Sequence, residues 1–190
     1  MTDTTNTTAL GTEAAATEEK KKKSKLRSPM HYPQMFLLHA LVIILVVWGL
    51  FGVVFGVMSA PNNDMYPRFD SGDLLLYYRL DRDVKAQDTI VLDKNDTTYV
   101  GRVVAVGGDT VDITDDERLI VNDNAVVETN IFYPTPRYEG FMNYPVTVPE
   151  GECFVLVDSR ESGEDSRYYG TVSMDEIEGT VITVLRRSNL

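Results

Sequence analysis

The sequence is poor in the residues that build disulfides and transition-metal sites. It holds one cysteine, Cys153, and two histidines, His31 and His39, in 190 residues. A single cysteine excludes an internal disulfide and a cysteine-rich metal cluster, and zinc sites made of imidazoles need more histidines than this chain offers. We therefore expect no metal and no cofactor. Because Cys153 lies in an apolar run, we interpret it as a buried, inert thiol.

Positive charge is scarce in the last two thirds of the chain. From Ser59 onward there are twelve Lys and Arg against twenty-five Asp and Glu, a net charge of −13, whereas the residues up to Met58 carry +2. Nucleic acid and anionic lipid repel such an acidic domain, so we expect no nucleic-acid partner. Basic partners, or a cation-rich cell wall, suit this charge better.

One long segment has no charged residue at all. Residues 35–58 (MFLLHALVIILVVWGLFGVVFGVM) contain no Asp, Glu, Lys or Arg. A helix of this length extends about 36 Å, and a hydrocarbon core is about 30 Å thick. We interpret the segment as a retained transmembrane helix. A buried core helix would need a larger domain around it, and the apolar region of a cleaved signal peptide is usually shorter, at about 7–15 residues.

Basic residues directly before the apolar segment indicate its direction. Lys20–Lys23, Lys25 and Arg27 precede it, so the positive-inside rule makes residues 1–34 a cytoplasmic tail. The first part of that tail is rich in Thr, Ala and Glu, a composition typical of disorder. Residues 59–190 would then form an extracytoplasmic domain of a single-pass cell-membrane protein. We interpret His39 as an interfacial residue without a functional role.

Beyond residue 58 the sequence shows no helical period of convincing length and is typical of short strands. Strands are expected over residues 73–80, 89–92, 98–106 with a continuation over 110–113, 118–121, 125–128, 145–148, 153–157 and 180–185. Asn122–Asn124 predicts a hairpin, and residues 175–179 one helical turn. The predicted fold class is mainly β, an antiparallel β-domain of about 130 residues, closed or half closed, behind one N-terminal transmembrane helix.

Four short motifs follow one another in the outer domain. They are Asp64-Met65-Tyr66-Pro67 with Gly72-Asp73 after it, Arg102–Asp109 (RVVAVGGD), Asn122-Asp123, and Val157–Gly170 (VDSRESGEDSRYYG). Each is weak alone, but in this order behind one apolar span they resemble bacterial type I signal peptidases, family S26. The family patterns are S-M-x-P with G-D, K-R before an apolar run and G-D, N-G, and G-D-N-R-x-x-S-x-D-S-R-x-x-G. The resemblance covers roughly residues 35–186. It implies a β-rich domain whose shallow groove binds an extended substrate as an added strand.

The resemblance places the two catalytic groups at positions where this chain lacks them. In the family a Ser hydroxyl attacks the scissile carbonyl, and a buried, neutral Lys takes its proton. The Ser position is Asp64 and the Lys position is Gly101. The Ser that supports the Lys corresponds to Gly163, one residue after Ser162, and Asn62 stands at a position tied to the oxyanion donor. Without the resemblance, Asp64 is a carboxylate capping a turn and Gly101 a strand glycine that allows a close backbone approach.

Replacement groups for the missing pair are few. An Asp-based peptidase would combine Asp64 with Asp158 or Asp165, but a carboxylate is a poor nucleophile towards an amide. An active signal peptidase with a displaced catalytic pair would draw on the serines and lysines nearest in sequence: Ser59, Ser71, Lys85 and Lys94. Five extended residues span about 16 Å, so each of these groups is remote along the chain from the position that it would replace.

The family positions that hold the loops are better preserved in this chain than the positions that carry the catalytic groups. The degenerate site and groove are expected to comprise Asn62, Asp64, Met65, Pro67, Gly101, Arg102, Ser162 and Gly163. The family positions that hold the last loop are kept as Asp158, Arg160, Asp165, Ser166 and Arg167. We expect Asp165 and Arg167 to form a pair that holds this loop.

A peptidase framework without peptidase chemistry indicates a binding protein. Signal-peptidase-like proteins with Asp and Gly at these two positions resemble the SipA-type proteins of Gram-positive pilus operons, chaperones or docking factors in sortase-driven pilin polymerisation. The resemblance implies a pilin subunit and a class C sortase as partners, with Asp64 facing a basic segment. If only the two catalytic groups were lost, Asp64→Ser with Gly101→Lys should restore cleavage. A membrane-tethered β scaffold unrelated to pili is the remaining hypothesis.

Overall fold

The computed structural model describes residues 31–81 and 83–186, so most of the expected cytoplasmic tail lies outside the described residues. The chain divides into two compact units, one ending at Val47 and one beginning at Trp48. Helix α2 (His31–Gly49) continues as a π-helical turn, η1 (Leu50–Val54). By length and composition the stretch Tyr32–Val54, with a mean hydropathy of 2.7, can cross a membrane.

The helical segment ends before the predicted span does. Residues 55–58, expected in the membrane, belong to strand β1 (Phe55–Ser59), which pairs with strand β2 (Leu74–Tyr78) from Phe55↔Tyr78 to Ser59↔Leu74. Strand β1 is the edge strand of its sheet, and β2 pairs with these residues along one side. Apolar composition alone does not separate the end of a helix from a strand, which is why the expected boundary at Met58 is wrong.

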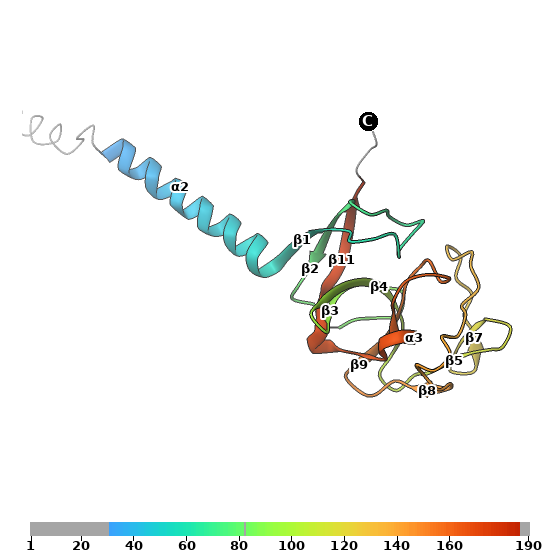
Figure 1. The fold of residues 1–190 in the computed structure, drawn as a ribbon. Coiled ribbons are helices and arrows are strands. Elements are labelled where there is room, and N and C mark those ends of the chain that lie inside the picture. The colour runs from blue at the N-terminus through green and yellow to red at the C-terminus, as the bar shows by residue number, and fades with distance from the viewer. Residues whose placement is uncertain (1–30, 82, 187–190) are drawn as a thin grey trace, which may run out of the picture. The chain divides into compact units, whose positions relative to one another are not determined.

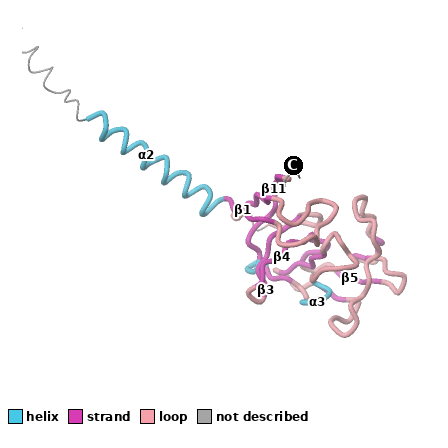
Figure 2. Tube along the Cα trace, turned by 45° about the horizontal axis from the view of Figure 1, so that its top comes forward, coloured by secondary structure: helices cyan, strands magenta, loops and turns pink. Residues whose placement is uncertain are grey.

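The larger of two antiparallel sheets has the strand order β1-β2-β11-β3-β4-β9-β10. Its further strands are β3 (Thr89–Lys94), β4 (Thr97–Val106), β9 (Glu152–Leu156), β10 (Val172–Ser173) and β11 (Ile177–Leu185). The smaller sheet has the order β7-β6-β5-β8, with β5 (Thr110–Ile113), β6 (Leu119–Val121), β7 (Asn124–Ala125) and β8 (Val146–Thr147). The predicted mainly antiparallel β fold is confirmed. Figure 2 shows how much of the chain around β5 is loop.

Three local expectations need correction or addition. Residues 110–113 do not continue the preceding strand, because the chain turns at Gly107-Gly108, where Gly108 has φ = 87°, and enters the smaller sheet. The expected helical turn at 175–179 is the 3₁₀ turn η2 (Met174–Glu176), closed by a capping box from Ser173. The short helix α3 (Ser166–Tyr169) was not predicted, since four residues give no readable period.

Strand β4 is buried on both faces, as its continuous apolar run indicates. Val103 packs with Val155 of β9 in one hydrophobic cluster, and Val104 packs with Phe154 in another. Val100 belongs to a third cluster, on the side of the loop that follows β1. Position 101 therefore lies inside a packed strand.

One edge of β4 is only half covered. The strand pairs with β3 from Lys94↔Thr97 to Thr89↔Arg102, but its pairing with β9 starts at Arg102↔Leu156. Within residues 31–81 and 83–186, Thr97–Gly101 thus has a strand neighbour on one side only. The open segment ends at Gly101.

The β6–β7 hairpin depends on two residues with positive φ. Asn122 (49°) and Asp123 (62°) form the two-residue turn between Val121 and Asn124. A residue other than Gly, Asn or Asp loses roughly 1–2 kcal/mol in this conformation. Asp123→Ala should therefore lower the free energy of unfolding by about 1 kcal/mol, whereas Asp123→Gly should leave it within a few tenths. Urea unfolding of the full chain in detergent micelles measures both, and equal stabilities of the two variants would contradict this account of the turn.

Candidate functional site

The loop after β1 presents Asp64 in a fixed orientation. The Asn62 amide donates to Asp64 Oδ2 at 2.6 Å, and the Asp64 backbone N–H donates to Asn62 Oδ1 at 3.1 Å. The neighbouring Met65 is 1% exposed and anchors the loop in a hydrophobic cluster. The Ser159 N–H donates to the Asp64 carbonyl at 2.8 Å, which ties this loop to the loop that follows β9.

The Asp64 carboxyl lies in unfavourable surroundings for a negative charge. Its pKa is raised above the ordinary 3.8, chiefly because partial burial removes water from the carboxyl group. The hydrogen bond from Asn62 opposes the shift, and the charges of Asp165 and Glu164 add to it. Among the described residues, Asp64 forms no ion pair with a cation.

Gly163 lies directly against Asp64. Its φ of 104° is a conformation that L-residues rarely adopt, and a Cβ atom at this position would lie 2.8 Å from Asp64 Cγ and 2.9 Å from Oδ1. The preceding Ser162 is exposed, and its hydroxyl lies 3.1 Å from the hydroxyl of Ser159. The structure therefore brings together Asn62, Asp64 and Gly163, with the carboxyl group in the space beside the glycine.

Gly101 is equally confined. It pairs with Ile90 of β3, and a Cβ atom at this position would lie 2.4 Å from Val155 Cγ1 and 3.4 Å from the Leu156 carbonyl oxygen. Its neighbour Val100 shares a hydrophobic cluster with Met65, the neighbour of Asp64. Positions 64 and 101 are thus flanked by side chains of one hydrophobic cluster.

A buried ion pair fixes the start of the loop after β9. Arg102 donates from Nε and Nη2 to the two carboxylate oxygens of Asp158, at 2.8 and 2.6 Å, and from Nη1 to the Gln87 carbonyl at 3.1 Å. The two side chains are 6% and 2% exposed. Bidentate, charge-assisted geometry of this kind is among the stronger polar contacts in proteins. It joins β4, next to Gly101, to the loop.

Arg160 is completely buried and has a partner for each of its three nitrogen groups. Nε donates to the Val157 carbonyl at 2.7 Å, Nη1 to Thr135 Oγ1 at 2.9 Å, and Nη2 to Glu128 Oε1 at 2.6 Å. The last two partners come from the long segment between β7 and β8. Neither partner could be predicted from the sequence, because that segment carries no recognisable motif.

Asp165 and Arg167 form a second fully buried ion pair, with Nη2 to Oδ2 at 2.8 Å. The Asp165 side chain also caps α3 and accepts the Val157 N–H at 3.1 Å. The hydroxyl of Ser166 accepts the Val155 N–H at 2.9 Å. Asp165 and Ser166 therefore accept hydrogen bonds from the backbone of Val157 and Val155, respectively. The Asp165–Arg167 ion pair is in this way connected to the sheet as well as to the loop.

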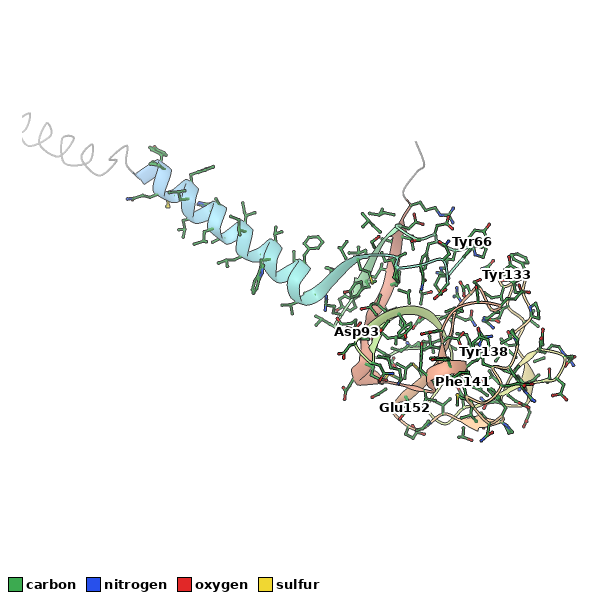
Figure 3. The ribbon with its side chains drawn as sticks, in the orientation of Figure 1. Tyr66, Asp93, Tyr133, Tyr138, Phe141 and Glu152 are labelled. Carbon is green, nitrogen blue, oxygen red and sulfur yellow. The ribbon has the colours of Figure 1, made fainter. Side chains whose placement is uncertain are left out.

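Two tyrosines outside the recognised motifs donate hydrogen bonds to the loop around Gly163. The Tyr138 hydroxyl donates to the Gly163 carbonyl at 3.0 Å, and its ring lies beneath the Arg167 guanidinium, 4.2 Å from its centroid. The Tyr99 hydroxyl donates to Glu164 at 2.9 Å. Figure 3 shows Tyr138 beside α3. Tyr99 lies on the half-open edge of β4, so this contact joins the edge to the site loop.

Pro67 lies at the same cavity as the Arg102–Asp158 ion pair. Together with Arg102 and Asp158 it lines a cavity of about 330 Å³, whose remaining walls are Arg68, Asn130 and Phe132. A larger cavity of about 540 Å³ lies between residues 114 and 144 and is lined by none of the predicted site residues.

The lysines considered as replacement bases have other partners. Lys94 Nζ contacts both Glu176 oxygens at 2.9 and 3.0 Å and the Thr171 carbonyl at 2.9 Å. Lys85 is exposed beside Asp83, at 3.3 Å. Lys94 pairs with Thr97 at the far end of the β3–β4 hairpin, four residues before Gly101, or about 13 Å along the strand.

The serines considered as replacement nucleophiles lie apart from these lysines. Ser59 ends β1 in an exposed position. Ser71 is also exposed, and its backbone N–H donates to Asn63 Oδ1 at 2.7 Å. Among the described residues, Lys94 and Lys85 are paired with carboxylates of Glu176 and Asp83 and not with either serine hydroxyl.

Loss of the Arg167 guanidinium should be strongly destabilising. Arg167→Ala leaves the buried Asp165 carboxylate without its counter-charge, a change that lowers stability by about 3–5 kcal/mol. Chemical unfolding of the full chain in detergent micelles measures the loss. As a matched control, Arg118→Ala removes an exposed ion pair with Asp116 and should leave the midpoint nearly unchanged. Equal effects of the two changes would contradict a structural role for the buried pair.

Asp64 should make stability depend on pH in a defined direction. Because the folded-state pKa of Asp64 is raised, its ionisation is less favourable in the folded than in the unfolded chain. The resulting loss of folding stability grows as pH rises above the ordinary pKa of 3.8. Asp64→Asn should therefore raise the melting temperature relative to the original chain at pH 7, and the difference should shrink to zero below pH 3.8. A difference independent of pH would show that the carboxyl charge is not responsible.

Comparison with known proteins matches this framework to one family. The family model described as "Signal peptidase, peptidase S26" matches residues 34–185. Signal peptidase I of Bacillus caldolyticus is 32% identical over 154 residues, which cover 74% of this chain and 84% of that protein. Thylakoidal processing peptidase 1 of Arabidopsis thaliana is 29% identical over 137 residues, covering 64% of this chain and 39% of the plant protein.

A solved structure extends the comparison. A signal peptidase I from Enterococcus faecalis V583 is 28% identical, with a TM-score of 0.43, covering 53% of this chain and 97% of the other. Since the family model matches most of the chain, including both loops that meet at Asp64, the chain belongs to the signal peptidase family, peptidase S26.

Proposed function

We propose that this chain is a non-catalytic member of its family that holds an extended protein segment in the groove between the Asp64 loop and the open edge of β4. The observation that carries the proposal is the state of the two catalytic positions. Position 64 carries a carboxylate packed against Gly163, and position 101 carries no side chain. The proposed protein binds without cutting.

The chemistry of amide cleavage supports this proposal. Serine-type acyl transfer needs a nucleophile, a base within hydrogen-bond reach and a donor for the oxyanion. Asp64 offers a weak nucleophile, and its backbone N–H, a natural oxyanion donor, is bonded to Asn62. Lys94 is engaged by Glu176. An active enzyme with a displaced catalytic pair would have to break these contacts first.

The half-open edge of β4 supports binding of an extended segment. A strand added beside Thr97–Gly101 would bond to backbone groups that have no strand partner on that side within the described residues. It would run past Tyr99 and Glu164 towards Asp64. The acidic groups at that end favour a segment with a basic side chain.

The resemblance to SipA-type proteins of Gram-positive pilus operons gives the proposed partners, a pilin subunit and a class C sortase. The apolar helix Tyr32–Val54 would anchor the protein in the cell membrane as a single span, with the N-terminus cytoplasmic and the β-domain outside. A chaperone or docking factor in that place would present a pilin segment to the sortase at the membrane surface.

Pilus assembly in cells tests the role of Asp64. Asp64→Ala should reduce the pilin polymer ladder at least several-fold, because the groove loses the acid that faces the basic segment. Asp115→Ala, which removes an almost fully exposed carboxylate outside the groove, is the matched control and should leave the ladder intact. Unchanged polymerisation in the Asp64 variant would contradict the groove model.

A cleavage assay separates the proposal from the enzymatic alternative. The purified full chain in detergent should leave a secretory preprotein intact. Cleavage that disappears on Ser71→Ala would establish a displaced catalytic pair and overturn the non-catalytic function.

A further inference from the structure

Two close contacts, at positions 163 and 101, leave no room for additional side chains there. At one of them, the Asp64 carboxyl occupies the space that any Cβ atom at position 163 would need, with Cγ 2.8 Å from it. The backbone of Gly163, at φ = 104°, also excludes most L-residues. The carboxyl group and the glycine are complementary in shape.

The second contact lies in the sheet. Val155 Cγ1 would be 2.4 Å from a Cβ atom at position 101, far inside van der Waals contact. Val155 is fully buried among side chains of one hydrophobic cluster, which includes Ile90 and Val103. A β-branched side chain in a strand has few alternative rotamers, so the methyl group cannot simply move aside.

We infer that Asp64 with Gly163, and Gly101 with Val155, are two sterically matched pairs. The packing of each pair, and not only the identity of the residues, excludes the side chains that an active site would need. The inference rests on the proposed non-catalytic function and deepens it. Val155 and Gly163 become the residues that position the groove, although neither stands where the nucleophile or the base would be.

One consequence concerns repair of the site. Asp64→Ser with Gly101→Lys supplies both missing groups, but the new lysine would begin in the space of the Val155 methyl group. Its amine would also lack the hydroxyl at position 163 that the family resemblance calls for. The two-residue variant should therefore remain inactive.

A double-mutant cycle tests the pair in the sheet. Gly101→Ala adds only the clashing Cβ atom and should lower the melting temperature of the full chain in detergent by about 5 °C, although alanine is otherwise preferred to glycine in a strand. In a Val155→Ala background the same change should have no cost, because the space is free. Val91→Ala, in a different hydrophobic cluster, is the control and should not relieve it. Additive shifts in the Val155→Ala cycle would overturn the inference for this pair.

A glycine of similar conformation provides the control for the loop pair. Gly163 and Gly170 both have positive φ, at 104° and 85°, but nothing lies within 4 Å of a Cβ atom at position 170. Gly163→Ser should lower the melting temperature more than Gly170→Ser does, and the excess should vanish in an Asp64→Ala background, which removes Cγ and both carboxyl oxygens. The same excess in both backgrounds would overturn the inference for this pair.

These outcomes are independent of those that test the proposed function. The unfolding cycles report on packing whether or not the protein binds pilin. Cleavage by the variant with only Asp64→Ser and Gly101→Lys would overturn the steric inference and leave the non-catalytic function of the original chain standing. Cleavage by the original chain would overturn the function alone.

Discussion

Three buried guanidinium groups hold together the loops that form the candidate site. Arg102 is paired with Asp158, Arg167 with Asp165, and Arg160 is bonded to the segment between β7 and β8. Buried charges are tolerated only when every one is paired and hydrogen-bonded. These ion pairs and hydrogen bonds hold the loop after β9 in one position relative to β4.

The same constraint fixes the surroundings of Asp64 at the candidate site. Gly163 lies inside the loop that the arginines hold, and its carbonyl accepts the Tyr138 hydroxyl. Because this loop cannot easily withdraw, the Asp64 carboxyl fills the space beside the glycine and loses water, which raises its pKa. The rigid framework therefore constrains the site, and rigidity of this kind serves binding as well as catalysis.

The features of the fold that depend on local sequence pattern could be predicted from the sequence. The apolar helix, the mainly antiparallel sheets and the hairpin at Asn122-Asp123 follow from composition, strand period and turn residues. The end of the helix at Val54 does not, because residues 55–58 are as apolar in a strand as they would be in a membrane. The contact between position 101 and Val155 brings together residues 54 positions apart and depends on side-chain packing. The partners Glu128 and Thr135 have no motif and emerge only from the folded chain.

The central claim is that the groove binds an extended segment and releases it uncut, and site-specific photocrosslinking tests it most directly. A photoreactive amino acid at Thr98, exposed on the open edge of β4, should capture an intact pilin subunit in cells. The same group at Thr147, exposed on β8 of the other sheet, should not. Captured fragments that end at a new cleavage site, or equal capture from both positions, would contradict the account.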